Sequence, residues 1–190
     1  MLADDGPDAL ALRRVAADVG VSTRAVYDLF GSKQKLLEAM FIEGFARLGA
    51  AFDAVPVTQD PVEDLLALGL AYRRAVLENP HLYELMFGHP VPGFRPAPEV
   101  VQATLKSFDI LVRAIDRCAH DQLSDVDPLD AAMVLHGLVH GLVSLELRWG
   151  LGTPAEADRR WSTALSALTN GLALTARTDV LRDTEARVAA

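Results

Sequence analysis

A repeated helix-start signal constrains the fold of this chain more than any other sequence feature. In this signal, a residue whose side chain can cap a helix stands directly before a proline, the residue favoured at the first helical position. The signal occurs four times, at Asp60-Pro61, Asn79-Pro80, Asp127-Pro128 and Thr153-Pro154. Apolar residues recur at helical spacing after these starts, and no stretch alternates with the period of two that marks a strand. The sequence therefore predicts an all-α fold.

Glycine and proline residues set the remaining helix boundaries. Gly20 and Gly31 end two short helices near the N-terminus, and Ser22 and Ser32 can cap the helices that follow. Residues 88–98 hold four prolines and two glycines and predict a loop. We expect about nine helices, counting the last turn of a first helix at residues 1–6 and helices over 12–19, 23–30, 33–55, 61–79, 80–87, 98–122, 128–149 and 154–176.

Composition narrows the classes of protein to which the chain can belong. Of its 190 residues 51% are hydrophobic, and the net charge is −8, so any basic patch that binds nucleic acid must be local. The single cysteine, Cys118, excludes an internal disulfide and fits a reducing compartment. The longest apolar run, residues 131–145, is shorter than the roughly 20 residues that cross a bilayer. We expect a cytoplasmic protein without a membrane partner.

The two short N-terminal helices are spaced as a helix-turn-helix. The helix over 12–19, the turn Gly20-Val21-Ser22 and the helix ending near Phe30 would place a second, reading helix in a DNA major groove. Arg24 is the candidate base contact, because a guanidinium bonds guanine bidentately. The candidate phosphate contacts are Ser22, Thr23, Tyr27 and Lys33. The alternative is a plain helical hairpin with a solvated polar face.

The stretch LRRVAADVGVSTRAVYDLFGSKQKLLEAM resembles the DNA-binding module of tetracycline-repressor-type (TetR family) transcriptional regulators. The resemblance implies a homodimer that binds a near-palindromic, double-stranded operator through a helix-turn-helix domain at residues 1–45. It also implies a helical domain at 46–176 that binds an effector and dimerises, followed by a frayed tail at 177–190. NPHLYELMFG and LVHGLVSLEL resemble a subgroup with a Trp-His-Gly signature, in which His140-Gly141 would be the His-Gly and His136 would hold the Trp place.

The N-terminal segment departs from the family pattern in three ways. Only residues 1–6 stand where the family has its first helix, so we expect a truncated first helix. Ala11 replaces the usual capping Ser or Thr of the next helix, and Asp28 and Leu29 stand where basic, His or Tyr side chains often face DNA. Residues 1–40 hold five Lys/Arg and six Asp/Glu, which weakens phosphate binding. A helical dimer that binds a small molecule or protein and no longer binds DNA is therefore the alternative.

Aromatic, methionine and histidine side chains on separate predicted helices could line one effector pocket. Apolar walls with few polar groups are typical of small-ligand sites, and here they indicate a small hydrophobic or aromatic effector. The alternative is an ordinary hydrophobic core. The candidate lining residues are Tyr72, Tyr83, Met86, Phe87, Phe108, Met133, His136 and His140.

Few residues in the sequence indicate a metal site or an enzyme active site. His136 and His140 are four residues apart and project from one helix face, but no third ligand lies near them, so we expect no metal and no cofactor. There is no Gly-rich phosphate loop, no HExxH, no GxSxG and no set of two Glu-x-x-His motifs as in di-iron bundles. We therefore expect a regulator, most simply a repressor that an effector releases from DNA, and not an enzyme.

Two apolar stripes near the C-terminus predict the dimer interface. Gly137 and Gly141 would let the backbones of two helices approach closely, and a helix that is apolar nearly all round requires burial on more than one side. The alternative is an internal bundle in a monomer. The candidate interface residues are Leu138, Leu142, Leu145 and Trp149 on one helix and Trp161, Leu165, Leu168 and Leu172 on the next.

Overall fold

The computed structural model describes residues 20–88, 91–121 and 126–174, and within these ranges it contains helices and no β-strand. The all-α fold is thereby confirmed. The predicted helix over 12–19 and the helical turn at residues 1–6 lie outside the described residues. The elements are α2 (Thr23–Phe30), α3 (Lys33–Asp53), α4 (Pro61–Glu78), α5 (Pro80–Tyr83), the π-helical turn η1 (Glu84–Gly88), α6 (Pro98–Asp121), α7 (Pro128–Trp149) and α8 (Pro154–Leu174).

The predicted caps act where the sequence puts them, with one exception. The Asp60 carboxylate accepts hydrogen bonds from the backbone N–H groups of the first turn of α4, and Asp127 does the same for α7. Thr153 and Glu156 form a reciprocal capping box at the start of α8. Asn79 makes no side-chain cap; its side chain bonds Ala75 of α4 and Arg47 of α3 instead.

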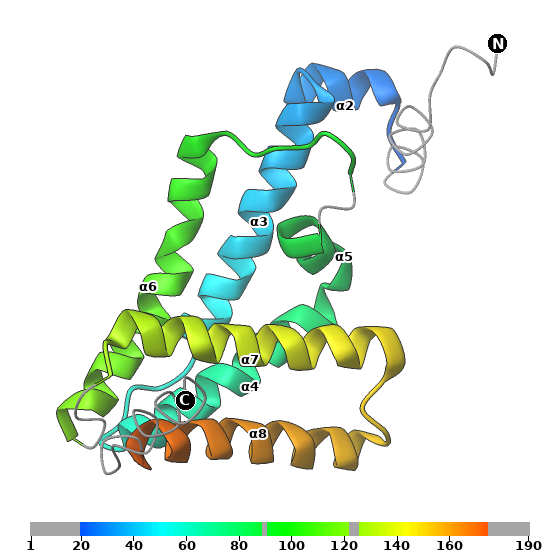
Figure 1. Ribbon diagram of the computed structural model, residues 1–190. Helices are drawn as coiled ribbons and strands as arrows, with labels where there is room; N and C mark the ends of the chain where they lie inside the picture. The colour runs from blue at the N-terminus through cyan, green and yellow to red at the C-terminus, as the bar shows by residue number, and fades with distance from the viewer. Residues whose placement is uncertain (1–19, 89–90, 122–125, 175–190) are drawn as a thin grey trace, which may run out of the picture.

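The helices form a bundle with α2 at one end and α8 at the other (Figure 1). Helix α3 runs from α2 into the bundle and packs along α6, and α4 and α7 also pack against α6. Helices α7 and α8 lie side by side and antiparallel. Because α3 is continuous from Lys33 to Asp53, the domain boundary expected between residues 45 and 46 falls inside one helix.

The apolar stripe of α8 faces the core of its own chain. Trp161 is 0% exposed and Leu165 is 1% exposed, and Leu168 and Leu172 pack, partly buried, against the same core. The prediction that Trp161 and Leu165 contact a partner subunit is therefore wrong. Their stripe is buried, as predicted, but against α4 and α7 rather than against a second copy.

A largely buried ion pair between α4 and α7 also reaches α8. The guanidinium of Arg73 on α4 bonds both carboxylate oxygens of Glu146 on α7 and also bonds Asp158 on α8. The indole Nε1 of Trp161 donates to the same Glu146 carboxylate at 2.7 Å. The carboxylates of Glu146 and Asp158 raise the pKa of Arg73. The indole of Trp161 links α8 to the same ion pair.

Helix α7 has one buried and one exposed apolar face. It has the length and mean hydropathy of a membrane-spanning helix, yet it packs between α4, α6 and α8. Only 28% of its most apolar stretch is buried within the protomer. The exposed face carries, at helical spacing, Val134, Gly141, Leu145 and Trp149, and Trp149 is 78% exposed. Leu138 and Leu142 border this face and are partly buried.

Candidate functional site

Helix α2 is held as a short, projecting unit by caps at both ends. The Ser22 hydroxyl accepts from the Ala25 N–H at 3.0 Å, which starts the helix. Gly31 ends it with a φ of 76°, and its N–H donates to the Tyr27 carbonyl. Val26 is buried and packs on Phe30 and Leu36. The side of α2 that carries Val26 therefore anchors the helix, and the opposite side is exposed to solvent.

The outer side of α2 carries the predicted DNA contacts. The Arg24 side chain is 89% exposed, Tyr27 is half-exposed, and Thr23 is partly exposed at the first turn. Arg24 Nε lies 3.8 Å from an Asp28 carboxylate oxygen, so the two side chains form a surface ion pair. Lys33 begins α3, where Ser32 caps the helix. DNA contact by Ser22, Thr23, Arg24, Tyr27 and Lys33 stays a prediction.

The first half of α3 is bonded to the loop that precedes α6. Gln34 Nε2 donates to the Arg95 carbonyl at 2.8 Å and also to the buried carboxylate of Glu38. The bonds from Gln34 and Lys35 hold the pKa of Glu38 below its usual value. The Phe41 ring meets the Phe94 ring edge-on, with centroids 6.3 Å apart. The end of α3 next to α2 is thus tied to the loop over residues 91–97.

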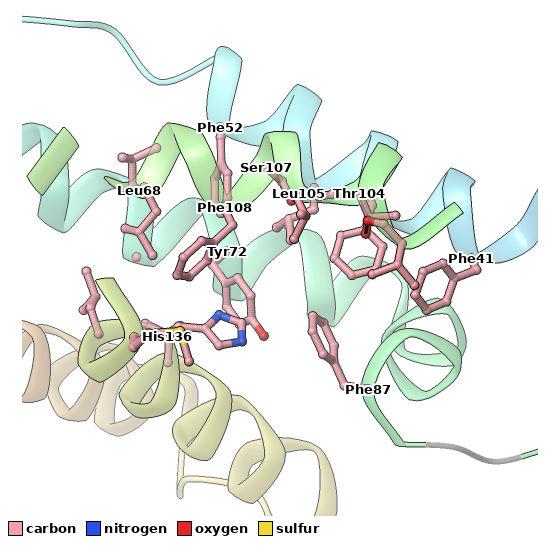
Figure 2. Close-up of a pocket in the computed structure, with 18 residues that line it drawn as sticks. Phe41, Phe52, Leu68, Tyr72, Phe87, Thr104, Leu105, Ser107, Phe108 and His136 are labelled. Atoms are coloured by element: carbon pink, nitrogen blue, oxygen red, sulfur yellow. Dashed lines mark hydrogen bonds between the residues drawn. The ribbon is translucent and has the colours of Figure 1, made fainter. Parts of the chain in front are cut away.

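A cavity of about 390 Å³ lies between α3, α4, α6 and α7. Figure 2 shows aromatic side chains along its length, with Tyr72 and His136 close together and Phe41 toward the opposite side. Phe87 of η1 closes one wall, and Thr104 and Ser107 of α6 contribute hydroxyls. This volume falls in the range of small-molecule sites. Its walls are apolar and are built mainly from these four helices.

The structure brings five of the eight predicted lining residues to this cavity. They are Tyr72, Phe87, Phe108, Met133 and His136. The other three, Tyr83, Met86 and His140, do not line it, and this part of the prediction is corrected. Tyr83 and Met86 instead border a separate hollow of about 20 Å³. The Tyr83 hydroxyl lies 3.1 Å from Nδ1 of His140, so these two residues satisfy each other.

Burial keeps both histidines of α7 neutral near pH 7. Burial lowers the pKa of His136, and the neighbouring His140 lowers it further. Burial also lowers the pKa of His140, and Glu84 partly opposes this shift. The two imidazole rings stack with centroids 5.8 Å apart. In the described part of the chain, no three His, Cys, Asp or Glu side chains are grouped to hold a metal ion.

The sequence prediction missed the contribution of α3 and most of that of α6. The missed aromatic residues, Phe41, Phe45 and Phe52, recur along one face of α3, and this spacing was the available signal. A stripe at that spacing marks a buried face but does not distinguish a cavity wall from a packed core. The further missed lining residues are Leu48, Leu68, Gly69, Val101, Thr104, Leu105, Ser107, Leu111, Leu135 and Val139.

Comparison with known families matches both parts of this architecture. Residues 1–40 match the family described as bacterial regulatory proteins, tetR family, and residues 65–168 match the tetracyclin repressor-like, C-terminal domain. The second match covers more than half of the chain. The chain therefore belongs to the tetracycline-repressor family of transcriptional regulators, and the family assignment made from the helix-turn-helix is confirmed. The proteins of this family are transcriptional regulators and not enzymes.

Individual relatives agree with the family. The HTH-type transcriptional regulator Rv1816 of Mycobacterium tuberculosis is 30% identical over 101 residues, which cover 52% of this chain and 43% of that protein. The chain thus matches less than half of this relative's length. A solved Rhodococcus sp. RHA1 protein of unknown function is 32% identical, with a TM-score of 0.72 over 90% of this chain and 89% of that one. The TetR family transcriptional regulator PfmR of Thermus thermophilus shares the fold, with 19% identity and a TM-score of 0.65 over 83% and 86% of the two chains.

Proposed function

We propose that this regulator is a cytoplasmic, homodimeric repressor that binds a near-palindromic operator and is released by a small hydrophobic or aromatic effector. The observation that carries the proposal is the position of α3. This helix begins beside the reading helix α2, and four of its side chains line the cavity. Occupancy of the cavity would therefore act on the helix that begins beside the reading helix and carries Lys33 at its first position.

DNA reading would use the exposed side of α2. Arg24 would leave its surface pair with Asp28 and bond a guanine edge, while Ser22, Thr23, Tyr27 and Lys33 would contact phosphates. Two such helices in a dimer would enter major grooves about 34–36 Å apart, one turn of DNA. The Asp28 carboxylate beside Arg24 opposes phosphate binding, which supports a modest rather than a high affinity.

A second copy of the chain would cover the exposed face of α7. Leu145 and Trp149 stand out on this face, and Gly141 allows the partner helix to approach closely. Leu138 and Leu142 would extend the contact at its edge. Burial of this apolar face supplies the free energy of association. The proposed interface omits Trp161 and Leu165, which are already buried in the protomer.

Effector release would operate through the α3–loop contact. A ligand that fits the cavity must bind one conformer better than another, or the DNA-binding equilibrium does not shift. Phe41 lines the cavity and also contacts Phe94, so a ligand that moves its ring changes the support of the α2 end of α3. Through this contact, occupancy of the cavity would change the distance between the two reading helices of the dimer.

The proposal is tested by fluorescence anisotropy of the purified chain with DNA from directly upstream of its own coding sequence, across a salt series. Saturable binding that weakens with salt is expected. Arg24→Ala should weaken it by about five- to a hundredfold, the value of one bidentate base contact. Arg113→Ala is the matched control, because Arg113 is an exposed arginine of α6 that bonds the Asp109 carbonyl of its own helix.

Two outcomes contradict the proposal. If Arg24→Ala keeps full operator affinity, Arg24 is not the base contact. If neither this chain nor one extended at its N-terminus binds the DNA at any salt concentration, the DNA-independent alternative replaces the repressor, and a ligand-binding helical dimer is the function to pursue.

A further inference from the structure

The cavity offers no partner for a charged ligand. Among the eighteen described residues that line it, there is no Asp, Glu, Lys or Arg. Its one titratable imidazole, His136, is kept neutral by burial and by its neighbour His140. An ion placed here would lose its hydration without gaining a counter-charge, which costs far more than burial of a neutral molecule. The walls therefore select against carboxylates and ammonium ions.

The two aliphatic hydroxyl groups in the walls are already engaged in hydrogen bonds. The Thr104 hydroxyl donates to the Val101 carbonyl at 2.7 Å, and the Ser107 hydroxyl donates to the Thr104 carbonyl at 3.0 Å. Each bond lies within α6 and uses the only proton of its hydroxyl. Neither residue is therefore a free donor to a ligand.

The phenol hydroxyl of Tyr72 differs from these two hydroxyl groups. Its oxygen is buried and has no hydrogen-bond partner among the described residues, and the residue as a whole is only 3% exposed. Burial raises the pKa of this phenol, so it remains a donor at any physiological pH. A buried hydroxyl without a partner is destabilising. Tyr83, by contrast, is paired with His140.

The unpaired hydroxyl lies in the wall beside His136. The Tyr72 and His136 rings meet edge-on, with centroids 6.3 Å apart, and Figure 2 shows the phenol oxygen next to the imidazole. The surrounding surface is aromatic, because Phe87 and Phe108 both meet the His136 ring edge-on or tilted within about 6 Å. The polar end of the cavity thus holds the Tyr72 hydroxyl and the neutral imidazole of His136, set in an aromatic surface.

We propose that the effector is an uncharged, aromatic carbonyl compound whose oxygen accepts a hydrogen bond from Tyr72 Oη beside His136. This inference rests on the proposed function, since it names the ligand class of the same cavity. The volume of 390 Å³ equals that of about thirteen liquid water molecules, so it suits a molecule of two fused rings with a short substituent. The aromatic walls favour flat rings that stack or meet edge-on.

Four naphthalene probes of matched shape test the inference by titration calorimetry with the full chain at neutral pH. They are 2-acetylnaphthalene, 2-ethylnaphthalene, 2-naphthoate and 2-naphthylmethylammonium. The ketone should bind tightest, the hydrocarbon about two- to tenfold more weakly because it lacks one hydrogen bond, and the two ions at least about tenfold more weakly. This order in the wild-type chain needs no variant to be informative.

Tyr72→Phe then isolates the hydrogen bond. It should weaken ketone binding by about two- to tenfold and leave hydrocarbon binding unchanged, because the hydroxyl that the variant removes bonds the ketone but not the hydrocarbon. Hydrocarbon binding also shows that the variant is folded. Tyr83→Phe is the matched control, since Tyr83 does not line the cavity, and it should keep the wild-type ratio of ketone to hydrocarbon affinity.

Three results overturn the inference: either ion binds as tightly as the ketone, Tyr72→Phe weakens ketone and hydrocarbon equally, or none of the four probes binds. The operator titration described above is made on the same preparation and reads DNA binding without a ligand. Failure of the ligand class is therefore distinguishable from failure of the proposed regulator function.

Discussion

Arg73 and Glu146 form a two-point ion pair across α4 and α7, with Nη2 of Arg73 2.7 Å from Oε1 and Nε 2.9 Å from Oε2 of Glu146. Both side chains are more than four-fifths buried. A planar guanidinium and a carboxylate match each other in this geometry, which fixes the relative register of the two helices. Because Trp161 donates to the same carboxylate, the pair also orients α8.

Loss of the carboxylate should be costly. Glu146→Gln leaves the largely buried Arg73 without its main counter-charge, and we expect a loss of about 3 kcal/mol in the free energy of unfolding. Urea titration followed by tryptophan fluorescence measures it, because Trp161 is buried. The control is Glu43→Gln, which breaks the exposed Glu43–Arg47 pair and should cost less than about 1 kcal/mol. Equal losses in the two variants would contradict the structural role of the buried pair.

Two glycines in helix interiors should respond oppositely to alanine. A Cβ at Gly69 would lie 2.7 Å from Cδ2 of Leu165, and this side chain is only 1% exposed and must shift within a packed core, so Gly69→Ala should lower the free energy of unfolding by about 1–3 kcal/mol. A Cβ at Gly49 meets nothing within 4 Å. Gly49→Ala should therefore raise stability by about 0.5–1 kcal/mol. Thermal unfolding of both variants checks the pair, and two shifts of the same sign would contradict it.

The exposed face of α7 gives a test of the homodimer. A Cβ at Gly141 meets nothing within 4 Å in the protomer, so Gly141→Gln should leave the protomer folded. In a dimer built on this face the longer side chain would separate the helices, and we expect at least about a tenfold weaker association by sedimentation velocity. Ala50→Gln, at an exposed position of α3, is the control. An unchanged dimer in Gly141→Gln would move the interface away from this face.

Stability should fall as the pH drops below about 6.5. The pKa values of His136 and His140 lie below 6.5 in the folded chain, because burial opposes protonation, and return to that value on unfolding. As the pH falls through this window, the unfolded chain binds protons that the folded chain does not, which favours unfolding. Tyr72, Phe87 and Phe108 pack around His136, and Glu84 acts only on His140, where it partly offsets the shift.

Urea unfolding between about pH 7.5 and 5.5 measures this dependence, above the range where carboxylates titrate. In His136→Gln the decline in the free energy of unfolding should be smaller than in the wild-type chain. The control is His81→Gln, at an exposed histidine of α5, which should keep the wild-type slope. A slope unaffected by His136→Gln would show that this imidazole is not the group that resists protonation.

The helix boundaries could be predicted from the sequence because the signals that set them are local. An aspartate before a proline caps the helix that it precedes whatever the helix packs against, as Asp60 and Asp127 do. What a helix packs against is not local. The stripe that holds Trp161 and Leu165 predicts a buried face equally well for a partner subunit and for the same chain, and only the fold decides between them.

The same limit explains why only some residues of the candidate site could be predicted from the sequence. Tyr72 and Tyr83 lie on neighbouring helices with similar apolar surroundings, and their sequence context does not distinguish them. The structure pairs Tyr83 with His140 and leaves Tyr72 in the cavity wall without a partner among the described residues. Likewise, the phenylalanines of α3 were visible as an apolar stripe, but their arrangement around a hollow depends on the distance between α3 and α6, which no local signal encodes.

Phe41 both lines the cavity and contacts Phe94, and this limits how such a regulator can come to respond to a different effector. Leu105 and Met133 line the cavity at exposed positions on other helices, so substitutions there can change ligand preference while the α3–loop contact is kept. Substitutions at Phe41 change the cavity and the Phe94 contact together. The wall of the cavity thus divides into positions free to diversify and one position under two constraints, and a biosensor built on this scaffold should be diversified at the former.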